Sequence, residues 1–269
     1  MERKTRMLTV LVIIAALTIG LIFALPYTAT RLFNRINSVE NPGEAKARGR
    51  ELLKESKVIV AVGGHPDDLE YYTGGTLGVL AAEGKTVIGV ISADKSPVQE
   101  ARRAEMRKAA EILGYKAVFL DHPDRGLTRT DRAEIREQIK EIIKKYNADT
   151  VIAYDYADQG PIYHHVDHIA TGIEAQAAAR EAGIDNVYLY FSADPNTSID
   201  ISGVLTKKSE AMAAHVSQHS RPYLVPLSWL FGWIRPTGSA DTAGDRNTAT
   251  GTAAADNHFF GNTEYFRKL

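Results

Sequence analysis

The chain has 269 residues, of which 44% are hydrophobic, and it carries a formal net charge of −1. This length suits one sizeable α/β domain, and the balanced charge gives no reason to expect a nucleic-acid partner. The absence of cysteine excludes disulfides, thiolate metal sites and cysteine nucleophiles. Any metal must therefore be held by histidine and carboxylate side chains.

The N-terminus predicts a membrane anchor. Residues 8–25 form an uncharged apolar run of 18 residues after a basic segment at 1–7, near the minimum length for a helix that spans a bilayer. A removable signal peptide and a buried helix are the alternatives, although no clear cleavage site ends the run. Because a basic flank stays in the cytoplasm, we expect a membrane-anchored protein, in contact with membrane lipids, whose catalytic domain is extracytoplasmic. A cytoplasmic-facing domain is the alternative.

Residues 26–56 are expected to form a linker and a charged helix, and residues 57–269 a single domain. In that domain apolar runs of strand length alternate with helical patterns. The expected strands are 57–62, 86–92, 117–121, 150–154 and 186–191, and the expected helices are 74–83, 97–113, 131–146, 165–182 and 207–215. Strands separated by helices predict a Rossmann-like α/β domain with a mostly parallel sheet and helices on both faces.

Two late segments have unusual composition. Residues 224–234 (LVPLSWLFGWI) contain both tryptophans, Trp229 and Trp233. They are expected either to pack in the core or a lid, or to enter the interface of the membrane that the anchor contacts. Residues 236–256 are rich in Gly, Thr, Ala and Asp without periodicity, which is typical of a long mobile loop.

The first candidate site follows the first predicted strand, where the sequence reads Gly-Gly-His65-Pro-Asp67-Asp68-Leu-Glu. In an open α/β sheet ligands bind beyond the carboxyl ends of the strands. His65 and Asp68, three residues apart, can converge on one cation and leave Asp67 free beside it. Two adjacent carboxylates repel each other unless a cation or a proton offsets their charge. This pairing favours a metal site over the turn role that is usual for an isolated loop histidine.

A second cluster lies about a hundred residues later, in Tyr163-His164-His165-Val166-Asp167-His168. His165 and His168 are three residues apart, so on a helical turn both project to the same side. His164 is an alternative to His165 as the functional histidine, but at helical spacing its side chain projects away from the side that His165 and His168 share. Asp167 either orients a ligand histidine or caps the helix.

Together the two stretches resemble the paired motifs of the PIG-L/LmbE family of zinc-dependent N-deacetylases, which read roughly His-Pro-Asp-Asp-Glu and His-Pro-Asp-His. Leu69 stands where the family usually has an acid, with Glu70 one place later, and Val166 replaces the second proline. The resemblance covers roughly residues 57–220 and a short C-terminal piece.

The resemblance implies a metal ion, Zn²⁺ or another divalent cation, held by His65, Asp68 and His168. It also implies that Asp67 is the general base and that His165 steadies the oxyanion or protonates the departing amine. A helix-cap carboxylate is the alternative for Asp67.

Further residues match the family more weakly. The resemblance implies substrate binding by Arg102 and Tyr163, and a supporting position for His215 in the segment Ala-His-Val-Ser-Gln. Asp124 follows the third predicted strand at the same edge of the sheet, where it is expected to bind a sugar hydroxyl. Arg102 alternatively pairs with Glu105 or lies on a solvated helix face, and Asp124 alternatively serves a turn. The piece at 264–267 resembles a terminal family segment of unclear role.

The predicted activity is removal of an N-acetyl group from an amino-sugar substrate of the N-acetylglucosamine type, with a lipid-linked sugar or a cell-envelope glycan among the candidates. One alternative is a non-catalytic α/β domain that binds a nucleotide or a glycan, although the chain lacks Gly-x-Gly-x-x-Gly. Another is an amidase of the same family that acts on a non-sugar amide. The motifs do not separate the two amide substrates.

Overall fold

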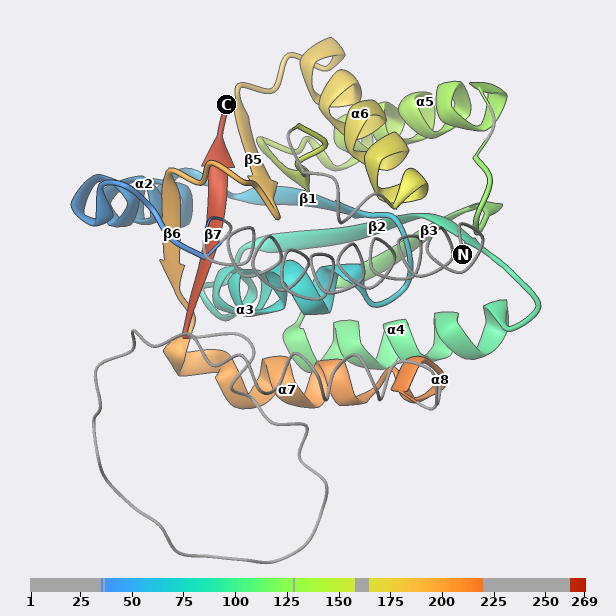
Figure 1. Ribbon diagram of the computed structural model, residues 1–269, viewed down its shortest axis with the longest axis horizontal. Helices are drawn as coiled ribbons and strands as arrows, with labels where there is room; N and C mark the ends of the chain where they lie inside the picture. Colours follow the sequence, from blue (N-terminus) through green and yellow to red (C-terminus); the bar gives the residue numbers. More distant parts are fainter. Residues whose placement is uncertain (1–34, 36, 128, 158–164, 220–261) are drawn as a thin grey trace, which may run out of the picture.

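The computed structural model describes residue 35 and residues 37–127, 129–157, 165–219 and 262–269, which form a sheet with helices around it (Figure 1). The strands are β1 (Val58–Gly63), β2 (Thr86–Lys95), β3 (Lys116–Pro123), β4 (Thr150–Tyr154), β5 (Asn186–Tyr190), β6 (Thr197–Asp200) and β7 (Thr263–Lys268). The helices are α2 (Pro42–Glu55), α3 (Asp68–Ala82), α4 (Gln99–Leu113), α5 (Arg129–Tyr146), α6 (Val166–Glu181), α7 (Leu205–Ala213), α8 (Val216–His219) and the 3₁₀ turn η1 (Ser202–Val204).

The sheet is mostly parallel, which confirms the predicted fold class. Its strand order is β3-β2-β1-β4-β5-β7-β6, and the five strands from β3 to β5 pair in parallel. The chain moves outward from β1 to β3 and then returns to place β4 beside β1. The order therefore reverses between β1 and β4, and ligands of such sheets bind beyond the carboxyl ends of the strands at this point.

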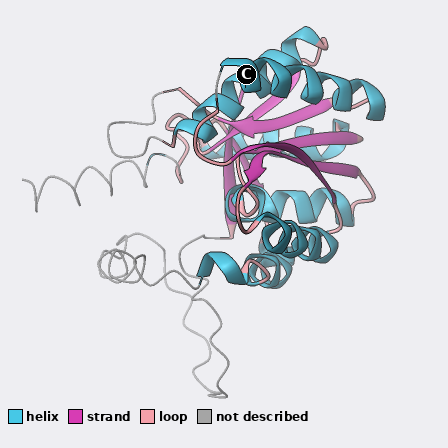
Figure 2. Ribbon diagram, turned by 90° about the vertical axis from the view of Figure 1, so that its right-hand side faces the viewer, coloured by secondary structure: helices cyan, strands magenta, loops and turns pink. Residues whose placement is uncertain are grey.

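Helices cover both faces of the sheet, as predicted. Successive side chains of a strand point to opposite faces, and in β1 Ile59 and Ala61 pack in the core with α3 and α4 while Val60 and Val62 pack with α5 and α6. Figure 2 shows the strands between these two helical layers. A strand that is buried on both faces explains why the sequence of β1 is apolar throughout.

Helix α3 begins at Asp68, six residues before the predicted start at Gly74. The glycines lie inside the helix because the chain packs closely there: a Cβ on Gly75 would lie 2.6 Å from Cδ1 of Ile201. The backbone N–H groups of Gly75 and Thr76 also donate to the Glu264 carboxylate, at 2.9 and 2.7 Å. The predicted helix start is wrong because the glycine pair marks a close approach, not an entry into the helix.

Strands β6 and β7 are absent from the sequence prediction. β7 lies between β5 and β6 and pairs antiparallel with both. Its side chains connect distant parts of the domain: Arg267 donates to both carboxylate oxygens of Asp155 at 2.8 Å, and Glu264 forms a buried ion pair with Lys208 at 2.6 Å. The segment 264–267 thus fastens the far side of the sheet to the end of β4 and to α7.

The predicted localisation needs correction. The expected anchor at 8–25, the tryptophan segment at 224–234 and the expected loop at 236–256 lie outside the described residues. Among the helices that the structure describes, none is long and apolar enough to cross a bilayer, and this contradicts the predicted membrane-anchored protein with an extracytoplasmic domain. Helix α5, for example, has 18 residues, but many of its side chains are charged.

Candidate metal centre and catalytic site

The loop after β1 is shaped by hydrogen bonds to Asp68. One oxygen of this carboxylate, Oδ2, accepts from the backbone N–H groups of Gly64 and His65, at 2.9 Å each. The loop approaches helix α6 so closely that a Cβ on Gly64 would lie 2.7 Å from Cδ2 of His168. Position 64 therefore requires glycine for the two halves of the site to meet.

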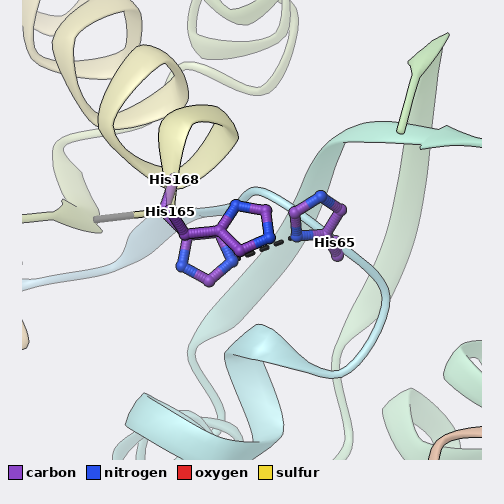
Figure 3. Close-up of side chains that lie close together, drawn as sticks. All are labelled: His65, His165 and His168. Atoms are coloured by element: carbon purple, nitrogen blue, oxygen red, sulfur yellow. Dashed lines mark hydrogen bonds between the residues drawn. The ribbon is translucent and has the colours of Figure 1, made fainter. Parts of the chain in front are cut away.

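The three donors that the sequence analysis groups together lie around one point. His65 Nδ1 is 3.0 Å from His168 Nε2, and Asp68 Oδ2 is 3.1 Å from His168 Nε2 and 3.8 Å from His65 Nδ1. All three residues are buried, with 4–7% of their surface exposed. Figure 3 shows His65, from the loop after β1, facing the histidines at the start of α6.

His165 completes a group of three imidazoles. Its ring stacks on His168 with centroids 4.3 Å apart and meets His65 edge-on at 4.7 Å. Nitrogen atoms of His65, His165 and His168 lie within 4.8 Å of one another, so these residues also offer a possible ligand set. Burial and the charges of His168 and His65 lower the pKa of His165, which makes its protonated form a stronger acid.

The other nitrogen of His65 faces two carboxylates. Nε2 is 3.2 Å from Asp167 Oδ2 and 3.4 Å from Asp124 Oδ1. Asp167 is fully buried and also accepts from the backbone N–H of Arg125 at 2.7 Å. Burial lowers the pKa of His65, but hydrogen bonds to Asp124 and Asp167 and the charge of Asp68 outweigh it and raise the pKa to about 10. The Asp167 carboxylate thus contacts both His65 and the loop after β3.

Asp67 occupies the N-cap position of α3 in a rare backbone conformation, with φ of 124°. Its side chain makes no capping hydrogen bond, so the alternative of a helix-cap carboxylate is wrong. Burial and the adjacent charge of Asp68 raise its pKa to about 7, against the opposing effect of Arg102. A carboxylate with such a pKa in a strained backbone is typical of a functional position.

Arg102 is buried, with 4% of its surface exposed, so it does not lie on a solvated helix face. It donates to Asp124 Oδ2 and to the carbonyl of Pro66 at 2.9 Å each, and approaches Asp67 Oδ1 at 3.4 Å. It does not pair with Glu105, which accepts from the backbone and the hydroxyl of Ser217. Arg102 therefore links the loops that follow β1 and β3.

Behind the first turn of α3 lies a buried group that the sequence analysis finds only in part. His215 Nε2 donates to Glu70 Oε2 at 3.1 Å, and the Tyr115 hydroxyl donates to Glu70 Oε1. Glu70 and Tyr115 have no predicted role, although the shift of the acid from position 69 to 70 is a signal in the sequence. Tyr163 and His164 lie outside the described residues.

The donors around His65 fit a divalent cation. Two imidazole nitrogens and a carboxylate oxygen, buried at the end of a strand, are the ligands that catalytic zinc sites use. Asp68, Asp124 and Asp167 all contact His65, and Arg102 together with the protonated His65 offsets only part of this negative charge. A bound cation would relieve the remaining repulsion.

The chain is similar to known N-deacetylases. Residues 60–179 match the PIG-L family, described as GlcNAc-PI de-N-acetylase. The chain is 28% identical over 218 residues to diacetylchitobiose deacetylase of Thermococcus kodakarensis, which covers 68% of this chain and 80% of the relative. It is 26% identical over 186 residues to a probable N-acetyl-α-D-glucosaminyl L-malate deacetylase of Bacillus cereus, which covers 60% of this chain and 83% of that protein.

A solved structure shows the same arrangement of the chain. N,N'-diacetylchitobiose deacetylase from Pyrococcus horikoshii superimposes with a TM-score of 0.56 at 25% identity, over 72% of this chain and 85% of that chain. Fold, site and relatives define a metal-dependent N-deacetylase. Residues 60–179, which contain both paired motifs around His65 and His168, carry the similarity to the PIG-L family that these motifs predict.

Proposed function

We propose that the protein is a zinc-dependent hydrolase that removes the N-acetyl group from an amino sugar of the N-acetylglucosamine type. The observation that carries the proposal is the convergence of His65 Nδ1, His168 Nε2 and Asp68 Oδ2 within 3.8 Å, beside an uncapped Asp67. The sugar is taken from the relatives, whose names describe deacetylases of diacetylchitobiose and of glucosaminyl malate.

In this proposal His65, Asp68 and His168 hold the metal. A divalent ion held there would polarise the acetamide carbonyl and would lower the pKa of a bound water to about 7. Asp67 accepts the proton from the water that attacks the acetamide carbonyl. His165 donates a proton to the sugar nitrogen as the C–N bond breaks. The products are acetate and a free amino sugar.

Asp124 and Arg102, beside the metal ligands, are proposed to bind the sugar. Arg102 orients the Asp124 carboxylate through a hydrogen bond of 2.9 Å, and 16% of the Asp124 side chain remains exposed. We propose that Asp124 accepts a hydrogen bond from a sugar hydroxyl and that Arg102 fixes its direction. Tyr163 stays a proposed substrate contact outside the described residues, and Asp167 is proposed to orient His65 through Nε2.

Acetate release from a panel of N-acetylglucosamine oligomers, glycosides and non-sugar acetamides tests the proposal. We expect turnover on the sugars that chelator abolishes and zinc restores. Asp67→Asn should retain one metal per chain while kcat falls roughly 10²–10⁴-fold, and Asp185→Asn, on an exposed position, serves as the control. Turnover confined to non-sugar amides would select the alternative amidase, and absence of both bound metal and acetate release would select a binding domain.

A further inference from the structure

The first turn of α3 carries a buried carboxylate that the proposed chemistry does not use. Glu70 is fully buried, and its two oxygens accept from different elements: Tyr115 precedes β3, and His215 follows α7. His215 is also fully buried. A carboxylate held from two sides in this way is fixed in position, because moving it would leave buried polar groups without partners.

The spacing of Asp67 and Glu70 is that of a capping box. In this motif the N-cap side chain accepts from the backbone N–H three residues later, and the acid at that third position reaches back to the N-cap N–H. Asp67 is the N-cap of α3 and Glu70 lies three residues on. Yet Asp67 makes no side-chain capping bond, and the Glu70 oxygens bond instead to Tyr115 and His215. The sequence thus has the residues of a capping box, but in the fold Asp67 and Glu70 do not make its hydrogen bonds.

The backbone of Asp67 would gain from closing the box. Its φ of 124° lies in a region that non-glycine residues rarely adopt, whereas an N-cap residue ordinarily has extended backbone angles. If Glu70 turned toward the N-terminus of α3, residue 67 could relax and its carboxylate would become a capping group. The carboxylate would then no longer be available to accept a proton.

We propose that His215 and Tyr115 are positioning residues, which hold Glu70 away from the start of α3 and thereby keep the Asp67 carboxylate free for catalysis. The inference rests on the proposed function, in which Asp67 is the base. His215 is itself fixed from two directions: its backbone N–H donates to the Met212 carbonyl in α7, and Ser217, two residues later, binds Glu105 of α4 through its backbone N–H and its hydroxyl. The packing of α7 and α8 on α4 thus supports the reacting carboxylate.

The test uses His215→Phe, which keeps a ring of similar volume but removes the donor to Glu70. We expect kcat to fall at least tenfold, with KM within twofold of the parent and one metal per chain. The double variant His215→Phe/Glu70→Leu removes the group that would close the box, and kcat should recover at least threefold over His215→Phe. Lys208→Met is the matched control, because it loosens α3 from α7 through Glu264 without touching Glu70, and its kcat per folded chain should stay within twofold.

A crystal structure of His215→Phe separates this inference from the proposed function, because it does not depend on turnover. It should show Glu70 turned toward the backbone N–H of Asp67 and an ordinary φ at residue 67. Glu70 unmoved in that structure would overturn the inference, and so would a kcat of His215→Phe within twofold of the parent, or a double variant no faster than the single one. A parent that releases no acetate would overturn the proposed function, while the crystal structure would still decide whether the box is held open.

Discussion

The close approach of the two halves of the site at Gly64 provides a quantitative test. In Gly64→Ala the new Cβ would lie 2.7 Å from Cδ2 of His168, and ordinary contact begins at 3.4 Å, so the imidazole must move by about 0.7 Å. Metal–ligand distances tolerate only about ±0.2 Å. The same Cβ would lie 3.1 Å from Asp68 Oδ2, so a second ligand is also pushed.

We expect this variant to bind zinc about 10–100-fold more weakly, which is about 1.4–2.7 kcal/mol. At saturating zinc, kcat/KM should still fall about 10²-fold, because a misplacement approaching 1 Å has an effect of that size. Competition with a chromophoric chelator measures the zinc affinity, and acetate release measures the rate. Gly203→Ala is the control, since a Cβ there meets no atom within 4 Å. A Gly64→Ala protein with zinc affinity within twofold of the parent would refute the placement of His168 beside this loop.

Two further predictions concern charge. Lys208→Met leaves Glu264 buried without its ion-pair partner, which lies 2.6 Å away in the parent. The variant should lower the free energy of unfolding, measured by urea denaturation, by about 3–5 kcal/mol. Lys207→Met, at an exposed position, is the control, and equal stability of the two variants would show that the ion pair does not stabilise the fold. Because the pKa of His65 is raised to about 10 in the metal-free protein, the residue is protonated at neutral pH and must lose this proton when a metal binds. Zinc binding between pH 7 and 9 should therefore release about one proton from His65, and zinc affinity should rise with pH up to about 10. Calorimetry in buffers of different ionisation enthalpy measures the proton release. Binding heats that do not vary between the buffers would contradict this prediction.

The central part of the fold follows from local sequence patterns. β4 and the end of α4 at Leu113 match their predicted bounds, because a short apolar run and a helix that stops before glycine are strong local signals. The start of α3 and the strands β6 and β7 do not follow, since they depend on contacts between distant residues. Gly75 packs on Ile201, and β7 pairs with strands that precede it by more than sixty residues.

The candidate site shows the same division. The meeting of His65 with His168 is predictable because their motifs follow strands that adjoin at the point where the strand order reverses. The partners of Arg102 are not predictable, because Asp124 and the Pro66 carbonyl reach it only after three elements have packed. Helical spacing suggests an ion pair between Arg102 and Glu105, but this pair does not form because the arginine is buried against the loops.

The place of β7 between β5 and β6 bears on how the chain folds during synthesis. β6 leaves the ribosome more than sixty residues before the strand that joins it to the rest of the sheet. Until Thr263–Lys268 emerges, β5 lacks its antiparallel partner and β6 lacks the strand through which it pairs with the sheet. Exposed strand edges invite pairing with other chains, so we expect the nascent protein to be most prone to aggregation in the interval before β7 emerges.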